Sequence, residues 1–133
     1  NTLQCIQKLK KEGYRIVATT PHKNDCNLQD FDLTKGKTAL LFGTEMEGLT
    51  DVALQEADEY LKIPMYGFTE SFNLSVAAAV CLQHISHQLR QEKIDWKLSD
   101  EYKDQILLNW LRYTIDRSDI IEKDYWNKRK NKT

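Results

Sequence analysis

The stretch that most constrains the fold runs from residue 63 to residue 85 and reads IPMYGFTESFNLSVAAAVCLQHI. Pro64 fixes its own φ angle and lacks an amide donor, so a strand that precedes it should end there. Polar residues before the apolar run, among them Ser71 and Asn73, favour a helix start. Apolar residues then recur at helical spacing, namely Leu74, Ala78, Cys81, Leu82, Ile85 and Leu89. The stretch predicts a strand end, a tight loop and a buried helix whose N-terminus presents free amides and polar side chains.

A similar unit lies immediately upstream. Residues 38–42, TALLF, form a continuous apolar run, which is typical of a strand buried on both faces of a parallel sheet. A glycine loop follows, and Thr50 can cap a helix predicted over residues 51–58, before a further strand at 59–63. The alternation of strand, loop and helix predicts an α/β domain. Two glycines five apart do not make a dinucleotide or nucleoside-triphosphate loop.

The first 37 residues contribute another helix and strand. Leu3, Ile6 and Leu9 have helical spacing, with Gly13 as the C-terminal cap, so a helix is already under way at the first residue. Residues 14–20 are predicted to form a strand and residues 26–37 a loop. We therefore expect the beginning of the protein to lie upstream of this chain.

The last third of the chain has a different character. Residues 91–98 read as a linker, a helix is expected from Ser99, and a shorter one from residue 118 to about residue 127. The first of these helices carries two apolar stripes, one of Ile106, Trp110 and Tyr113 and one of Leu107 and Leu111. So broad an apolar face needs cover, either from the domain itself or from a second subunit.

Composition limits the class of protein. With 133 residues, 41% of them hydrophobic, the chain can form one domain with a real core. It has no apolar run of membrane length and no signal peptide, so we expect a cytoplasmic protein with no membrane partner. The odd number of cysteines indicates free thiols, and the histidine spacing fits no metal motif, so no metal is expected. The basic end of the chain permits a nucleic-acid partner but also fits a solvated terminus.

Two motifs carry a resemblance to a known family. Residues 63–65, IPM, and residues 70–79, ESFNLSVAAA, resemble the C-terminal signature of the SpoU (TrmH) branch of the SPOUT RNA methyltransferases. Residues 41–49, LFGTEMEGL, are similar to the family's second motif, F-G-x-E-x-x-G-L. The two motifs stand in the family's order, and Phe72 occupies a position where leucine is commoner. From spacing alone, the same residues would also suit an ordinary strand, loop and helix.

The resemblance implies a fold and a cofactor. Members of the family have a parallel sheet between helices with a C-terminal deep trefoil knot, bind S-adenosylmethionine and work as homodimers. The knot follows from the resemblance alone, because chains are rarely knotted. Residues 1–90 would form the methyltransferase domain and residues 91–133 a C-terminal helical extension. The cofactor-binding residues implied are Gly43, Glu45, Gly48, Ile63, Met65, Ser71 and Leu74.

The reaction implied is S-adenosylmethionine-dependent methylation of a ribose 2′-hydroxyl in RNA. A tRNA guanosine is the expected target because the C-terminal extension looks like that of the tRNA-modifying members. The residues expected at the methyl-transfer site are Glu45, Ser71 and Asn73. The activating arginine belongs to an N-x-x-A-x-x-R motif that this chain lacks, so it is expected upstream of Asn1.

Other interpretations of these residues remain open. Glu45 could be a surface loop carboxylate, and Ser71 and Asn73 could simply cap a helix. The alternative functions are a ribosomal-RNA 2′-O-methyltransferase and a non-catalytic RNA-binding or dimerisation module that retains the fold.

Overall fold

The computed structural model describes residues 1–23 and 25–130, which form two compact units, residues 1–94 and residues 95–133. The first unit contains a parallel four-stranded sheet in the order β2-β4-β1-β3. Its strands are β1 (Arg15–Thr19), β2 (Cys26–Asn27), β3 (Thr38–Leu41) and β4 (Glu59–Lys62). The predicted parallel α/β class is therefore confirmed. The division of the chain into a methyltransferase domain at 1–90 and an extension at 91–133 stays a prediction.

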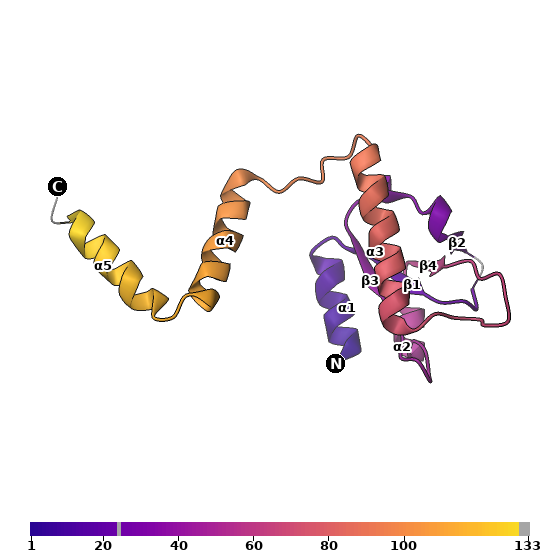
Figure 1. Cartoon of the computed structure of the whole chain (residues 1–133). Coiled ribbons are helices and arrows are strands. Elements are labelled where there is room, and N and C mark those ends of the chain that lie inside the picture. The colour runs from indigo at the N-terminus through magenta and orange to yellow at the C-terminus, as the bar shows by residue number, and fades with distance from the viewer. Residues whose placement is uncertain (24, 131–133) are drawn as a thin grey trace. The chain divides into compact units, whose positions relative to one another are not determined.

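Helices cover both faces of this sheet. The helices of the first unit are α1 (Thr2–Lys11), α2 (Asp51–Gln55) and α3 (Leu74–Gln91), and α3 crosses in front of the strands in Figure 1. Neighbouring residues of β1 point to opposite faces. Val17 packs in a cluster with Cys81 of α3, whereas Ile16 packs with Ile6 of α1 and Ala53 of α2. Two separate apolar clusters therefore hold the sheet between α3 on one side and α1 with α2 on the other.

The start of the chain differs in one detail from the prediction. Helix α1 begins at Thr2, and Asn1 caps it by accepting a hydrogen bond from the Gln4 amide at 2.9 Å. The helix was expected to be under way at residue 1, but a capping asparagine there satisfies the first free amides. Gly13 follows the helix with φ +82°, a conformation that glycine adopts readily.

The prediction of a loop over residues 26–37 was wrong in part. The segment contains β2 and two short 3₁₀ helices, η1 (Leu28–Asp30) and η2 (Leu33–Lys35). Three apolar side chains are buried there, Leu28, Phe31 and Leu33. These side chains belong to the same apolar cluster as Val17 and Cys81, so the segment contributes to the core of the domain.

Two burial predictions were also wrong. Strand β3 was expected to be buried on both faces, but it lies at the edge of the sheet and its residues are only half-buried. Leu82 was placed on the buried stripe of α3, yet it is 60% exposed, as the neighbouring Cys81 faces the sheet instead. A helix that covers one face of a sheet buries a narrow stripe and leaves the rest open.

A partly buried ion pair joins β1 to β4. Arg15 Nη1 lies 2.6 Å from Glu59 Oε2, with both side chains little exposed, and Arg15 Nη2 donates to the Asp32 carbonyl at 2.8 Å. The guanidinium also lies over the Phe31 ring, 4.8 Å from its centroid. These contacts make Arg15 a structural link between the sheet and the segment that follows β2.

The second unit consists of α4 (Asp100–Thr114) and α5 (Ser118–Lys130). Ser99 caps α4 as predicted, its hydroxyl accepting from the Tyr102 amide at 3.2 Å. Helix α5 runs three residues beyond the predicted end, and Lys132 of the basic tail lies outside the described residues. Among the described residues, no helix combines the length and the apolar character needed to cross a membrane.

Candidate functional site

A cavity of about 440 Å³ lies in the first unit at the carboxyl ends of the strands. The residues that follow β1, β3 and β4 line it, together with the first turn of α3. In parallel α/β sheets, ligands bind beyond the carboxyl ends of the strands, where loops of several strands meet. The position of this cavity therefore makes it the candidate ligand site.

The structure brings the predicted cofactor-binding residues together in this cavity. They come from three segments that are separate in the sequence, which are the glycine loop after β3, the segment after β4 and the beginning of α3. All seven line the cavity, namely Gly43, Glu45, Gly48, Ile63, Met65, Ser71 and Leu74. Their role in binding a cofactor stays a prediction.

The glycine loop has a closed backbone geometry. Thr44 and Gly48 form a two-residue antiparallel bridge, with N–H to carbonyl distances of 2.9 and 3.0 Å. Gly48 has φ +68°, and a Cβ built on Gly43 would lie 2.1 Å from the Gly48 carbonyl carbon. Because backbone atoms cannot give way to a side chain at that distance, only glycine fits at position 43. The two glycines of the motif are therefore needed for different reasons. Gly43 leaves room for the backbone of residue 48, and Gly48 adopts a positive φ angle.

Glu45 and Asn73 connect two walls of the site. The Asn73 side-chain amide donates a hydrogen bond to Glu45 Oε1, and its carbonyl oxygen accepts one from the Ser75 amide at 2.9 Å. Asn73 is thus both the N-cap of α3 and a link to the glycine loop. Glu45 is one of the residues that line the cavity, whereas Asn73 is not. Glu45 is exposed in its loop, so the interpretation as a surface loop carboxylate stays open, whereas Asn73 does cap α3 as the capping alternative predicted.

Ser71 lies in the cavity wall two residues before the helix cap. Since Asn73 provides the N-cap contact of α3, the capping interpretation of Ser71 is not supported. The Ser71 hydroxyl is placed where it can contact a bound molecule.

Sequence reasoning missed part of the lining. The last residue of β1, Thr19, lines the cavity together with Thr20, Pro21 and His22, which follow the strand, and with Phe42, which follows β3. Thr19 Oγ1 donates to the Leu41 carbonyl at 2.7 Å, which fixes this segment against β3. The available signal was topological, because the ends of adjacent parallel strands meet at one edge of a sheet.

A smaller cavity of about 320 Å³ borders the first one. The two cavities share Pro21, His22, Met65 and Glu70, so these residues form a common wall. The smaller cavity adds Lys62 at the end of β4, with Gly67 and Thr69 of the loop that follows.

The three cysteines are free, and two of them, Cys26 and Cys81, do not have the properties of activated nucleophiles. Cys81 is buried, and this burial raises the pKa of its thiol. Partial burial and the nearby Glu59 and Asp30 carboxylates raise the pKa of the Cys26 thiol. A raised pKa keeps a thiol protonated and unreactive at neutral pH. Within residues 1–23 and 25–130, no group of three His, Cys, Asp or Glu side chains is arranged to hold a metal ion.

Comparisons with known proteins agree on one family. Residues 1–83 match the model of the SpoU rRNA Methylase family. A tRNA (guanosine(18)-2′-O)-methyltransferase of Borreliella burgdorferi is 39% identical over 92% of this chain and 56% of its own length. The Thermus thermophilus enzyme of the same name is 40% identical over 82% of this chain and 57% of its own. The chain thus spans about half the length of the curated relatives it matches.

Solved structures give the same result for the fold. The crystal structure of the Aquifex aeolicus TrmH/SpoU tRNA modifying enzyme superposes with a TM-score of 0.73 at 33% identity, over 87% of this chain and 60% of that one. The SpoU methyltransferase AviRb of Streptomyces viridochromogenes, solved in complex with the cofactor AdoMet, gives 0.55 at 30% identity, over 65% of this chain and 32% of that one.

Proposed function

The chain belongs to the SpoU rRNA methylase family, and from this membership we propose that it is part of an enzyme that methylates a ribose 2′-hydroxyl of tRNA with S-adenosylmethionine. The observation that carries the proposal is that residues of both family motifs line one cavity, the larger of the two described above. The relatives named as tRNA (guanosine(18)-2′-O)-methyltransferases support a tRNA guanosine as the target.

The residues of the cavity fit S-adenosylmethionine. Its volume lies within the range of small-molecule sites, roughly 300–1,000 Å³. Phe42, Ile63 and Leu74 give it apolar walls suited to an adenine ring, and the Glu45 carboxylate complements a positively charged ligand. The missing Cβ of Gly43 lets residues 43 and 48 pack backbone against backbone, which shapes this wall.

When bound, S-adenosylmethionine supplies a methyl group that its sulfonium has already activated, and the electron pair of the broken carbon–sulfur bond remains on the sulfur. The protein must therefore position the acceptor oxygen and remove its proton. The Glu45–Asn73 hydrogen bond holds the glycine loop against the start of α3, and Ser71 lines the same cavity.

The group that activates the 2′-hydroxyl is the arginine implied by the family motif N-x-x-A-x-x-R. Arg15 is not a substitute for it, because its guanidinium is held by Glu59 and by the Asp32 carbonyl. We expect a longer form of the protein that contains the motif to transfer methyl groups to tRNA far faster than residues 1–133 do. Equal rates would show that the activating group has been assigned to the wrong segment.

We also propose that the first unit contains the trefoil knot that the family resemblance implies. Its support is that Thr19 of β1 and Cys26 of β2 pair with opposite edges of β4 at the same residue, Leu61. The link between them must therefore pass from one side of β4 to the other, and we propose that the chain after β4 is threaded to form the knot. Pulling the two ends apart in a single-molecule experiment should give a final length shorter than that of the fully extended chain.

We further propose that the protein is a homodimer, with α4 and α5 contributing to the interface. The support is the exposure of large apolar side chains on both helices, including Trp110, Leu111, Ile120 and Trp126. A cytoplasmic location is proposed with it and would be tested by fractionation.

Calorimetric titration of the chain with S-adenosylhomocysteine, the demethylated product, tests the cofactor site. We expect a one-site isotherm from folded protein. No heat and no thermal shift at millimolar ligand would contradict the assignment. The alternatives separate in a transfer assay with the longer protein, since a ribosomal-RNA enzyme would leave tRNA unmethylated and a non-catalytic module would bind RNA without transferring methyl groups.

A further inference from the structure

We propose that the loop after β4 binds the acceptor RNA, with Tyr66 and Phe68 stacking on unpaired bases and the smaller cavity holding the adjoining sugar and phosphate. This inference rests on the proposed function, because it takes the larger cavity to be the cofactor site.

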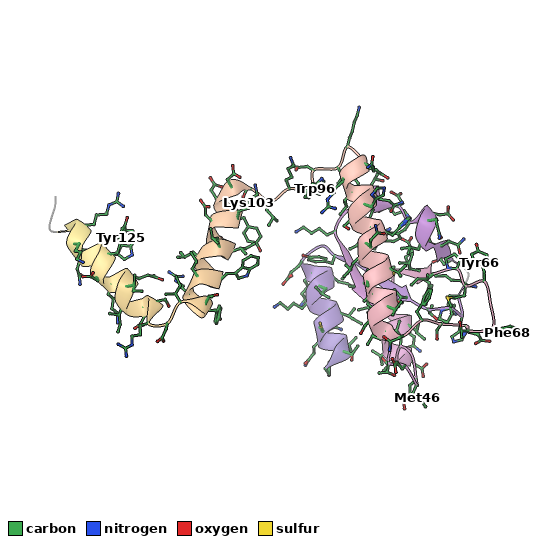
Figure 2. The ribbon with its side chains drawn as sticks, viewed as in Figure 1. Met46, Tyr66, Phe68, Trp96, Lys103 and Tyr125 are labelled. Atoms are coloured by element: carbon green, nitrogen blue, oxygen red, sulfur yellow. The ribbon has the colours of Figure 1, made fainter. Side chains whose placement is uncertain are left out.

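The two aromatic rings are open on all sides. Tyr66 is 96% exposed and Phe68 109%, so neither ring packs against the rest of the domain. Figure 2 shows both residues on the outer part of the loop that follows β4. Gly67 separates them and makes no contact within 4 Å of its Cβ position. Proteins that bind single-stranded nucleic acid use exposed aromatic side chains of this kind as stacking platforms.

The smaller cavity places this loop beside the proposed methyl donor. Its wall of Pro21, His22, Met65 and Glu70 is the wall of the larger cavity. An acceptor ribose must lie next to the cofactor to receive the methyl group, since transfer requires close approach and alignment. A nucleotide in the smaller cavity would satisfy this condition, with its neighbours extending towards Tyr66 and Phe68.

The residue types at the smaller cavity suit nucleic acid better than a second copy of the chain. Lys62 and His22 line it, and the single carboxylate among its lining residues is Glu70. Lysine is depleted in protein–protein interfaces, whereas it is a regular partner of phosphate. Two isolated rings beside a polar cavity also differ from the contiguous apolar patch that a subunit interface requires.

The test uses residues 1–133 and a single-stranded RNA hexamer that contains 2-aminopurine, whose fluorescence is quenched on stacking. We expect quenching with the unaltered protein and no quenching with the double variant Tyr66→Leu/Phe68→Leu. The affinity for RNA should fall about fivefold to 150-fold for each aromatic ring that no longer stacks on a base. Tyr102→Leu serves as the control, because Tyr102 is a half-exposed aromatic residue that lines neither cavity. This control should keep both quenching and affinity.

A second variant tests the cavity. Lys62→Gln should weaken RNA binding at low salt and reduce the slope of log K against log salt concentration by about 0.7, the value for one phosphate contact on a single strand. Titration with S-adenosylhomocysteine should give the same affinity for all variants, which also shows that they are folded.

The outcomes separate the two proposals. If the unaltered protein does not bind S-adenosylhomocysteine, the assignment of the larger cavity as the cofactor site is contradicted. Normal binding of that ligand, together with unchanged RNA quenching in the double variant or no RNA binding at all, would overturn the inference about the loop. A double variant that sediments as a monomer and still binds RNA normally would assign the two rings to a subunit interface instead.

Discussion

The two units of the chain differ in how far their apolar side chains are buried. In the described part of the molecule, the fully buried apolar side chains all belong to the first unit, and Val17 and Leu61 are 0% exposed. In the second unit neither α4 nor α5 has a buried residue, and Leu107 is 52% exposed. A sheet flanked by helices buries apolar surface within one chain, whereas two consecutive helices alone leave a broad stripe uncovered. The first unit therefore has its own core, whereas the second leaves large apolar side chains exposed.

The same contrast holds for charged pairs. Arg15 and Glu59 are 12% and 13% exposed and tie β1 to β4, whereas Arg112 and Glu122 of the second unit are 47% and 33% exposed. Breaking a largely desolvated pair such as Arg15–Glu59 costs more stability than breaking an exposed one, which contributes little.

The largest expected effect comes from removing the second unit. If α4 and α5 cover each other across a dimer, burial of one aromatic residue and two leucines stabilises the dimer by roughly 1.5–3 kcal/mol each. A chain that ends after Leu98 should then have a dimer dissociation constant at least about a thousandfold higher, measured by sedimentation equilibrium.

The matched control for this truncation ends after Asn127. It removes the basic residues Lys128, Arg129 and Lys130 of α5 and should remain dimeric. In the longer protein it should bind tRNA more weakly and with less dependence on salt. An equally tight dimer after the cut at Leu98 would show that the helices cover only their own subunit.

A pair of identical substitutions compares the two units directly. Leu61→Ala removes a side chain that is 0% exposed and should lower the free energy of unfolding by about 2–5 kcal/mol. Leu107→Ala removes one that is 52% exposed and should cost under about 1 kcal/mol in the monomer. Urea denaturation at a concentration below the dimer dissociation constant measures both. Similar losses for the two variants would mean that the second unit has a core of its own.

Gly43→Ala tests whether the close backbone packing of the glycine loop is needed for the stability of the first unit and for ligand binding. The new Cβ would lie 2.1 Å from the Gly48 carbonyl carbon, so the bridge between residues 44 and 48 must open. We expect a loss of about 1–3 kcal/mol in stability and at least tenfold weaker S-adenosylhomocysteine binding. Gly67→Ala is the stability control, since nothing lies within 4 Å of its Cβ position. Unaltered ligand binding in Gly43→Ala would place the cofactor away from the glycine loop.

The sequence predicted the parts of the fold that local signals determine. Thr50, Asn73 and Ser99 each accept a hydrogen bond from an amide of the helix that follows them. The strand at residues 38–42 was also found, but its burial was not, because only the order of the sheet decides which strand lies at the edge. The buried segment around Phe31 was missed, since its short strand and 3₁₀ turns have no periodicity to detect.

The residues of the site that belong to a sequence motif could be predicted. Those that reach the site only through the order of the strands could not. The glycine loop and the start of α3 carry family motifs, and their residues meet in one cavity. The residues after β1 have no motif, and they enter the wall because β1 lies between β3 and β4. The contact between Glu45 and Asn73 likewise joins residues 28 positions apart, a pairing that neither motif reveals by itself.

The smallest expected effect concerns the exposed ion pair of the second unit. Arg112 Nε and Nη2 donate to the two carboxylate oxygens of Glu122 at 2.7 and 2.9 Å, joining α4 to α5. This hydrogen bonding lowers the pKa of Glu122 below its ordinary value of 4.5. A carboxyl whose pKa is lower in the folded state stabilises that state above its unfolded pKa, and the contribution is lost as the pH falls through the folded value. The contact between α4 and α5 should therefore persist at neutral pH and weaken only below about pH 4.5. Carbon-13 NMR of the Glu122 carboxyl should give a titration midpoint below 4.5, and Arg112→Gln should return the midpoint to about that value. A midpoint of 4.5 or higher in the unaltered protein would show that the ion pair between Arg112 and Glu122 does not form in solution, which would leave the hydrogen bond from Ser118 Oγ to the Arg112 carbonyl to hold α4 against α5.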